Sequence, residues 1–221
     1  MRKKEEYYAT IQQELIELVP DGIEHILEFG CGTGLTGRAI KNKSKNKVEV
    51  VGVEIEPDIA EKARENIDKV INNDAEKIEL PYNSDYFDCM IYGNILEHLV
   101  YPERLLIKND KFLKSNGYVI AIIPNVAHYR VIKMLLRKEW NYADRGILDD
   151  THLRFFAIKN IKAMFNKANL KIIKIVKKIS GSKQKKIINR IFFGIITDYL
   201  TEEYIILAQK NKKVTESGLK M

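Results

Sequence analysis

The chain has 221 residues, of which 45% are hydrophobic and 30% are charged, and its formal net charge is +7 at pH 7. This length and composition suit one soluble globular domain, and we expect no second independent domain. The first residues are basic without a following apolar segment, and every apolar run is far shorter than the ~18 residues of a spanning helix. We therefore expect a cytoplasmic protein without a signal peptide or a membrane span.

Neither the charge nor the cysteines point to a particular partner. Much of the positive excess lies in scattered lysines such as Lys41, Lys43 and Lys45, which is typical of a solvated basic surface. Cys31 and Cys89 form no metal-binding pattern, and each lies where the core is expected. We expect two free thiols.

The chain opens with an expected amphipathic helix over residues 5–19. An apolar strand then ends at Glu28, and glycines follow at positions 30, 32, 34 and 37 before a helical pattern begins. Glycine permits positive φ and a close approach of the backbone, and a helix N-terminus behind such a turn carries partial positive charge. The stretch is therefore predicted to be a strand, turn and helix that hold a ligand.

A second buried strand is expected over residues 48–54, with Glu54 at its carboxyl end. Ligands bind at the carboxyl ends of strands in open α/β sheets. Glu54 can accept hydrogen bonds from both hydroxyls of a ribose, and Ile55 would present an apolar face to an adenine. The alternative is that Glu54 only caps the helix that opens at Pro57.

Strands and helices alternate five times up to residue 123, which predicts a parallel sheet with helices on both faces. The later elements of this series are a helix over residues 57–69 and a strand over 70–73, then a strand over 86–92, a helix over 102–113 and a strand over 118–123. Beyond them we expect a helix at 158–169, a strand at 170–176, a helix at 184–200, a strand at 203–210 and a frayed polar tail.

The glycine turn has two interpretations. Residues 32–37 fit G-x-G-x-x-G, which with Glu54 would make a dinucleotide site of an NAD-binding oxidoreductase. Residues 28–34, EFGCGTG, resemble motif I of the class I S-adenosylmethionine-dependent methyltransferases. Glu28 favours the second interpretation, because a carboxylate there would repel a diphosphate but suits the ammonium and sulfonium charges of S-adenosylmethionine. No further motif for hydride chemistry is present.

The resemblance implies a Rossmann-like α/β fold with a doubly wound seven-stranded sheet, strand order 3-2-1-4-5-7-6 and an antiparallel last strand. It implies one domain over residues 1–213, with the helical lead-in, a substrate-side cap insertion at residues 125–156 and a flexible tail at residues 214–221. It also implies S-adenosylmethionine as the cofactor and assigns Asp74 to the adenine amino group and the backbone of residues 92–95 to the methionine moiety. The expected cofactor-binding residues are Glu28, Phe29, Gly30, Cys31, Gly32, Gly34, Glu54, Ile55, Asp74, Ala75, Tyr92 and Asn94.

A second, more specific resemblance lies in the cap. PNVAHYRV at residues 124–131 and GILDDTHLRFF at residues 146–156 are similar to a bacterial and archaeal subgroup of these methyltransferases that is often associated with surface-polysaccharide genes. The resemblance implies O- or N-methylation of a small polar or sugar-type acceptor. Residues 142–156 offer aromatic faces and charged groups, so we expect them to fold over the acceptor.

Three of the four histidines follow strands or lie in the cap, on the expected substrate side. A hydroxyl acceptor must lose its proton, so His128, His152 and His98 are the candidate catalytic bases, in that order, whereas His25 precedes the first strand at its amino end. Asn94-Ile95-Leu96-Glu97-His98 is also similar to the E-x-x-E-H metal site of ubiquinone-pathway O-methyltransferases and small-RNA 3′-end methyltransferases. An amide replaces the first acid, so we expect no metal.

One alternative function remains open. The positive charge, with clusters such as Lys177-Lys178, is compatible with a nucleic-acid-directed methyltransferase or with a basic binding module that keeps the fold. Small-molecule acceptors are favoured, because the segment after the fourth strand lacks the N-P-P-Y type motif of enzymes that flip bases.

Overall fold

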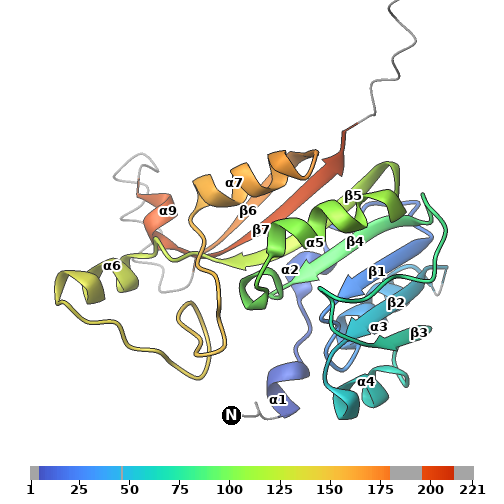
Figure 1. The fold of residues 1–221 in the computed structure, drawn as a ribbon, viewed down its shortest axis with the longest axis horizontal. Coiled ribbons are helices and arrows are strands. Elements are labelled where there is room, and N and C mark those ends of the chain that lie inside the picture. Colours follow the sequence, from blue (N-terminus) through green and yellow to red (C-terminus); the bar gives the residue numbers. More distant parts are fainter. Residues whose placement is uncertain (1–4, 46, 180–195, 212–221) are drawn as a thin grey trace, which may run out of the picture.

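The computed structural model describes residues 5–45, 47–179 and 196–211. Its centre is a seven-stranded sheet of order β3-β2-β1-β4-β5-β7-β6 (Figure 1). Strands β1 to β5 pair in parallel, and β7 is antiparallel to both β5 and β6. The predicted strand order and the antiparallel last strand are confirmed. The strands are β1 His25–Phe29, β2 Glu49–Glu54, β3 Lys69–Asn72, β4 Phe87–Gly93, β5 Leu113–Pro124, β6 Leu170–Ile179 and β7 Thr201–Lys210.

Helices cover both faces of the sheet because successive residues of a strand point to opposite sides. Leu27, Met90 and Val119 pack in one cluster with α5 and α7, whereas Ile26, Cys89 and Ile120 pack in another with α2 and α3. Both cysteines are buried free thiols, as expected. The helices are α1 Glu5–Tyr8, α2 Gln13–Ile16, α3 Leu35–Lys43, α4 Pro57–Ala63, α5 Pro102–Asn109, α6 Tyr129–Leu136, α7 Ile158–Lys167 and α9 Thr197–Leu200, with short 3₁₀ turns η1 Leu96–His98 and η2 Asp110–Phe112.

The prediction of one lead-in helix over residues 5–19 was wrong, because residues 9–12 between α1 and α2 are not helical. Residues 5–12, here called the N-terminal segment, cross the glycine turn instead. Thr33 donates from its backbone N–H to the carbonyl oxygen of Tyr8 over 3.1 Å, and Gln12 donates from its backbone N–H to the hydroxyl of Thr36 over 3.2 Å. The turn thus provides hydrogen bonds that a continuous helix would have made internally.

Several other boundaries differ from the expectations. The helices expected at residues 57–69 and 102–113 end at Ala63 and Asn109, and β5 begins at Leu113 because this residue already pairs with Phe87 of β4. The expected helix at residues 184–200 lies mostly outside the described residues, which include only its end as α9. The expected tail at residues 214–221 also lies outside them.

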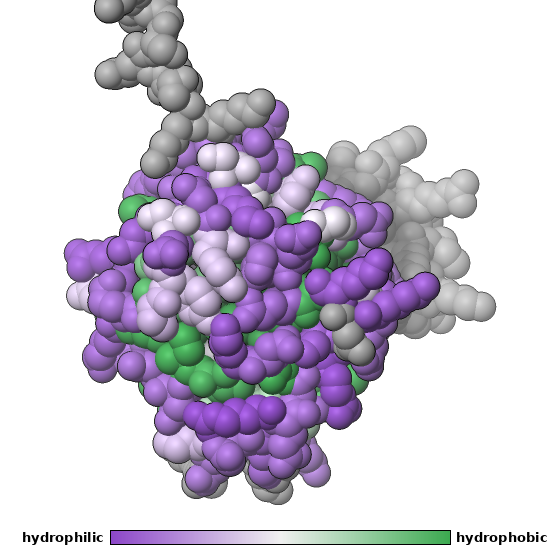
Figure 2. All heavy atoms as spheres, turned by 90° about the vertical axis from the view of Figure 1, so that its right-hand side faces the viewer, coloured by the Kyte–Doolittle hydropathy of each residue, from purple (hydrophilic) through white to green (hydrophobic). Residues whose placement is uncertain are grey.

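The cap, residues 125–156, leaves the carboxyl end of β5 and returns to it through an isolated bridge between Asn125 and Phe156. Figure 1 shows α1 and the loop after α6 at the same end of the sheet, toward which β1 and β4 point. Figure 2 shows the face where β1 and β4 begin, and hydrophilic residues cover most of it around a band of hydrophobic ones. Among the described helices, none is both long and apolar enough to cross a membrane.

Candidate functional site

A cavity of about 530 Å³ lies at the carboxyl ends of β1, β2 and β4. The glycine turn, the N-terminal segment, the turn η1 and the cap all contribute to its lining. Ligand-binding sites of open α/β sheets lie at this edge, and pockets for ligands are commonly 300–1,000 Å³. The cavity is therefore the candidate active site.

The backbone of the glycine turn needs glycine for two reasons. Gly30, Gly32 and Gly34 all have positive φ, at +65°, +54° and +76°. A Cβ atom on Gly32 would lie 2.5 Å from the carbonyl oxygen of Tyr8, which is closer than real Cβ contacts allow. The glycines therefore permit both the turn itself and the passage of the N-terminal segment over it.

Glu28 contributes a buried carboxyl group to the lining of the cavity. Its side chain lines the cavity with 4% of its surface exposed, and its Oε2 accepts no hydrogen bond from the described residues. Burial, together with the negative charge of Glu54, raises the pKa of Glu28 to about 8. A cationic ligand in the cavity would supply the missing partner.

Glu54 and Asp74 line the same cavity, but their oxygens already have partners. Glu54 accepts hydrogen bonds from the backbone N–H groups of Gly32 over 2.9 Å and Glu56 over 3.0 Å. Burial raises the pKa of Glu54, although these backbone donors oppose the rise. A hydrogen bond from Lys77 lowers the pKa of Asp74, whose Oδ1 also accepts from the backbone of Glu76. Both acids thus lie at the edge that the strand pattern predicted.

The other residues expected to bind the cofactor divide into two groups. Phe29 and Tyr92 are buried in the core, where their rings stack with centroids 5.0 Å apart, and Gly34 precedes α3, so these three do not line the cavity. The residues that do line it are Glu28, Gly30, Cys31, Gly32, Glu54, Ile55, Asp74, Ala75 and Asn94.

Of the three candidate bases, two line the cavity and one does not. His128 is fully buried at the start of α6, where its Nδ1 accepts a hydrogen bond from the backbone of Arg130, and it does not line the cavity. The preference for His128 as the base is therefore corrected, because its imidazole caps a helix in the core. His98 and His152 both line the cavity.

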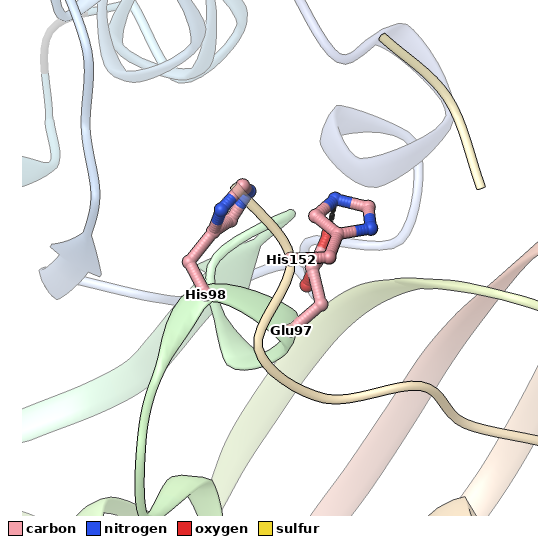
Figure 3. Close-up of side chains that lie close together, drawn as sticks. All are labelled: Glu97, His98 and His152. Carbon is pink, nitrogen blue, oxygen red and sulfur yellow. Dashed lines mark ion pairs between the residues drawn. The ribbon is translucent and has the colours of Figure 1, made fainter. Parts of the chain in front are cut away.

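His98 and His152 lie beside Glu97, which the sequence placed in the segment similar to E-x-x-E-H but not among the expected site residues. Figure 3 shows Glu97 and His98 on η1 and His152 on the cap loop, with their side chains gathered together. The two imidazole centroids are 4.7 Å apart, and Nε2 of His152 lies 4.0 Å from Oε1 of Glu97. Burial raises the pKa of Glu97 to about 8, and its Oε2 has no hydrogen-bond partner among the described residues.

Backbone hydrogen bonds hold the cap over η1. The carbonyl oxygen of Glu97 accepts from the backbone N–H groups of Leu153 and Arg154, both over 2.9 Å. Arg154 also donates from its guanidinium to the carbonyl oxygen of Val100. These bonds join segments that are more than fifty residues apart, so no local sequence pattern could have placed His152 beside Glu97.

The N-terminal segment joins the glycine-turn side of the cavity to the side that holds the histidines. The amide of Gln12 donates to Oδ1 of Asn94 over 3.2 Å, and the hydroxyl of Tyr7 lies 3.4 Å from Nε2 of His98. The guanidinium of Arg145 lies over the Tyr7 ring, 5.8 Å from its centroid. Apart from the irregular composition of the cap, which suggested a role for Arg145, nothing in the sequence signalled these contacts.

The lining of the cavity is acidic although the chain as a whole is basic. Among the described residues that line it, one is an arginine, Arg145, and eight are carboxylic acids. The acids are Glu28, Glu54, Glu56, Asp74, Glu76, Glu97, Asp149 and Glu203. Such a lining favours cationic ligands and disfavours polyanionic ones.

Comparisons with known proteins agree with this geometry. The family model described as "Methyltransferase domain" matches residues 2–175. The ubiquinone biosynthesis O-methyltransferase of Candida albicans is 27% identical over 115 residues, which are 49% of this chain and 35% of that protein. The ribosomal protein L11 methyltransferase of Thermosipho africanus is 27% identical over 124 residues, which are 52% of this chain and 46% of that protein. The matches thus span less than half the length of these relatives.

The fold is shared with solved structures. A SAM-dependent methyltransferase from Archaeoglobus fulgidus superposes with a TM-score of 0.64 at 19% identity, over 94% of this chain and 95% of that one. The buried carboxyl group of Glu28, whose Oε2 has no hydrogen-bond partner among the described residues, and the glycine turn fit a ligand with ammonium and sulfonium charges. The chain therefore belongs to the methyltransferase domain family, with S-adenosylmethionine as its cofactor.

Proposed function

We propose that the protein transfers the methyl group of S-adenosylmethionine to an oxygen or nitrogen atom of a small polar acceptor, such as a sugar. The observation that carries the proposal is the composition of one cavity, which combines the unpartnered Glu28 with the pair His98 and His152. The first suits a cationic cofactor, and the second suits an acceptor that must lose a proton.

The cofactor supplies an electrophilic methyl group when it is bound. Ionised Glu28 would stabilise the positive charges of the methionine end, Glu54 would accept from the ribose hydroxyls and Asp74 would accept from the adenine amino group. Ile55, with 59% of its surface exposed, would cover an apolar face of the base. We call these four residues the cofactor side of the cavity.

The hydrogen-bond partners of the two imidazoles favour one tautomer in each ring. Nδ1 of His152 lies 3.1 Å from the carbonyl oxygen of Ile147, which can only accept, so this nitrogen carries the hydrogen. Nδ1 of His98 lies 3.1 Å from the hydroxyl of Thr151, whose own hydrogen goes to Asp149 over 2.6 Å. In both rings the lone pair is therefore on Nε2, which could take a proton from the acceptor. We call Glu97, His98, Arg145 and His152 the acceptor side.

The acidity of the cavity supports a small acceptor over a nucleic acid. A nucleic acid brings a phosphate for every nucleotide, and a lining with eight carboxylic acids and one arginine offers that charge few favourable partners. The N-terminal segment and the cap both contribute to the walls of the cavity, through Tyr7, Thr10 and Arg145.

Transfer of a labelled methyl group tests the proposal. Methyl-tritiated S-adenosylmethionine is incubated with the protein and with separate pools of nucleotide sugars, small phenols and amines, and structured RNA. We expect label in a small-molecule pool, with transfer lost in Glu28→Gln and retained in His25→Gln, whose histidine lies at the opposite end of β1. Label in RNA alone would contradict the assignment of the acceptor.

A further inference from the structure

We propose that Glu97, His98 and His152 form a binding site for a divalent transition-metal ion on the acceptor side of the cavity. One potential ligand atom from each residue lies within 4.8 Å of those from the other two. All three side chains point toward the same space in Figure 3, although His152 is separated from the other two by more than fifty residues.

The distances are close to those of a coordinated ion. A metal about 2.1 Å from each ligand would hold neighbouring ligand atoms roughly 3 Å apart. The pair of Nε2 of His152 and Oε1 of Glu97 is already at 4.0 Å. Small side-chain rotations that move each ligand atom by roughly 1 Å would bring the three atoms to the spacing of a coordinated ion.

The hydrogen bonds around the two imidazoles match those of metal ligands. A histidine that binds a metal through one nitrogen generally donates the other N–H to a carbonyl or hydroxyl oxygen, which fixes the ring. His152 donates from Nδ1 to Ile147, and His98 donates from Nδ1 to Thr151. Each ring therefore offers Nε2 as a ligand without any change of tautomer.

The carboxylate provides an independent observation. Glu97 has 1% of its surface exposed, lines the cavity and leaves Oε2 without a hydrogen-bond partner among the described residues. A buried carboxylate oxygen without a donor is costly, and an ion at this position would be its partner. Asp149 and Glu203, which also line the cavity, would add to the attraction for a cation.

The ligand set selects the class of metal. Two imidazoles and one carboxylate on one side of an ion suit Mn²⁺, Fe²⁺, Co²⁺ or Zn²⁺ and leave coordination positions open. Mg²⁺ prefers oxygen ligands and binds such a site less well. Binding of the ion follows from the geometry alone, whereas its role in the reaction rests on the proposed function.

That role would be to bind the acceptor hydroxyl at an open position and lower its pKa. It would replace proton transfer to the imidazoles, because the ion would occupy the lone pairs on their Nε2 atoms. The O–H bond breaks and its proton passes to solvent water, the oxygen forms a bond to the methyl carbon, and the C–S bond breaks with its electron pair returning to sulfur. The metal changes no oxidation state, and no further reactant is needed.

Calorimetric titration of chelator-treated protein with MnCl₂, ZnCl₂, CoCl₂ and MgCl₂ tests the site without any activity measurement. We expect saturable binding of one ion per chain, with Mg²⁺ the weakest. Glu97→Gln and His152→Ala should each weaken binding by at least ~100-fold, since loss of a direct ligand exceeds the 10- to 100-fold effect of its supporting groups. His25→Gln, which removes a distant imidazole, is the control and should stay within about threefold.

Pulsed electron paramagnetic resonance on the wild-type protein with Mn²⁺ keeps the test independent of the variants' folding. Couplings to two imidazole nitrogens are expected, and their absence would overturn the site. Absence of binding by every ion, or equal binding by wild type and Glu97→Gln, would also overturn it. S-adenosylmethionine affinity and methyl transfer are measured on the same samples, and if both persist without metal, the role of the ion in the reaction is rejected while the proposed function stands.

Discussion

The two sides of the cavity are assembled in different ways. Glu28, Glu54 and Asp74 on the cofactor side each end or closely follow one strand of the parallel sheet. On the acceptor side, His152 belongs to the cap and reaches Glu97 only through the hydrogen bonds that dock the cap on η1. The fold itself therefore sets the cofactor side, whereas long-range loop contacts set the acceptor side. A substitution on one side should leave the other side's function intact.

The largest expected effect is that of His152→Ala on turnover. The variant removes an imidazole from the acceptor side, so turnover should fall at least ~100-fold through lost positioning or proton transfer. Affinity for S-adenosylmethionine should stay within about threefold, or ~0.7 kcal/mol. Kinetics with the acceptor and calorimetry with the cofactor separate the two effects. An equal loss of both would mean that the two sides are not independent.

Glu28→Gln should produce the reverse pattern. Loss of the ionised carboxylate should weaken S-adenosylmethionine binding by roughly 2 to 3 kcal/mol, the usual contribution of a charge-assisted contact in a buried site. Glu203→Gln is the matched control, since it removes another carboxylate of the lining and should change the affinity by less than about threefold. Calorimetry with S-adenosylmethionine is carried out on both variants. An equal loss of affinity in the two would show that the negative charge of the lining as a whole attracts the cofactor, and that Glu28 makes no specific contact with it.

Glu54→Ala should weaken cofactor binding by about 2 kcal/mol, because a pair of hydrogen bonds to the ribose is lost. The carboxylate also accepts from Gly32 and Glu56, so the variant additionally loosens the glycine turn. Glu56→Ala, at the start of α4, is the matched control. Unchanged affinity in Glu54→Ala would remove this residue from the site.

The raised pKa of Glu28 makes both cofactor binding and stability depend on pH. Because the folded pKa of about 8 exceeds the ordinary value of 4.5, the protonated form stabilises the cofactor-free fold below pH 4.5, and this contribution is lost as the pH rises through 8. Affinity for the cationic cofactor should rise about tenfold between pH 7 and pH 9, as the carboxylate ionises. Calorimetry from pH 7 to 9 should show the rise in affinity in the wild type and thermal unfolding from pH 4.5 to 8 the loss of stability, and Glu28→Gln should show neither contribution.

Arg154→Ala is expected to have the smallest effect. Arg154 belongs to the segment expected to fold over the acceptor, but its guanidinium donates to the carbonyl oxygens of Val100 and Leu153 and does not line the cavity. The variant should lower the free energy of unfolding by about 1 kcal/mol and change turnover by less than about threefold. A loss of turnover as large as that expected for His152→Ala would show that Arg154 acts on the acceptor.

The sequence was informative wherever a local pattern determines position. Alternating strands and helices predicted the sheet order through the family resemblance, and strand ends predicted that Glu28 and Glu54 would meet. The same rule failed for His128, which also follows a strand but turns inward to cap α6. It could not place Glu97 beside His152, because that contact depends on how the cap folds back over η1.

The N-terminal segment was mispredicted for a related reason. Its helical periodicity is real, but hydrogen bonds from Thr33 and Thr36 to the chain around Tyr8 and Thr10 compete with helix formation. Intrinsic helix preference contributes little over so few residues, so the tertiary contacts decide the conformation.

Titration of the wild-type protein with S-adenosylmethionine and, separately, with NADH tests the central claim most directly. The account predicts saturable binding of one S-adenosylmethionine per chain, weakened in Glu28→Gln and kept in His152→Ala, and no comparable binding of NADH. Binding of NADH without S-adenosylmethionine would contradict it, because Glu28 would then face a diphosphate that its charge repels.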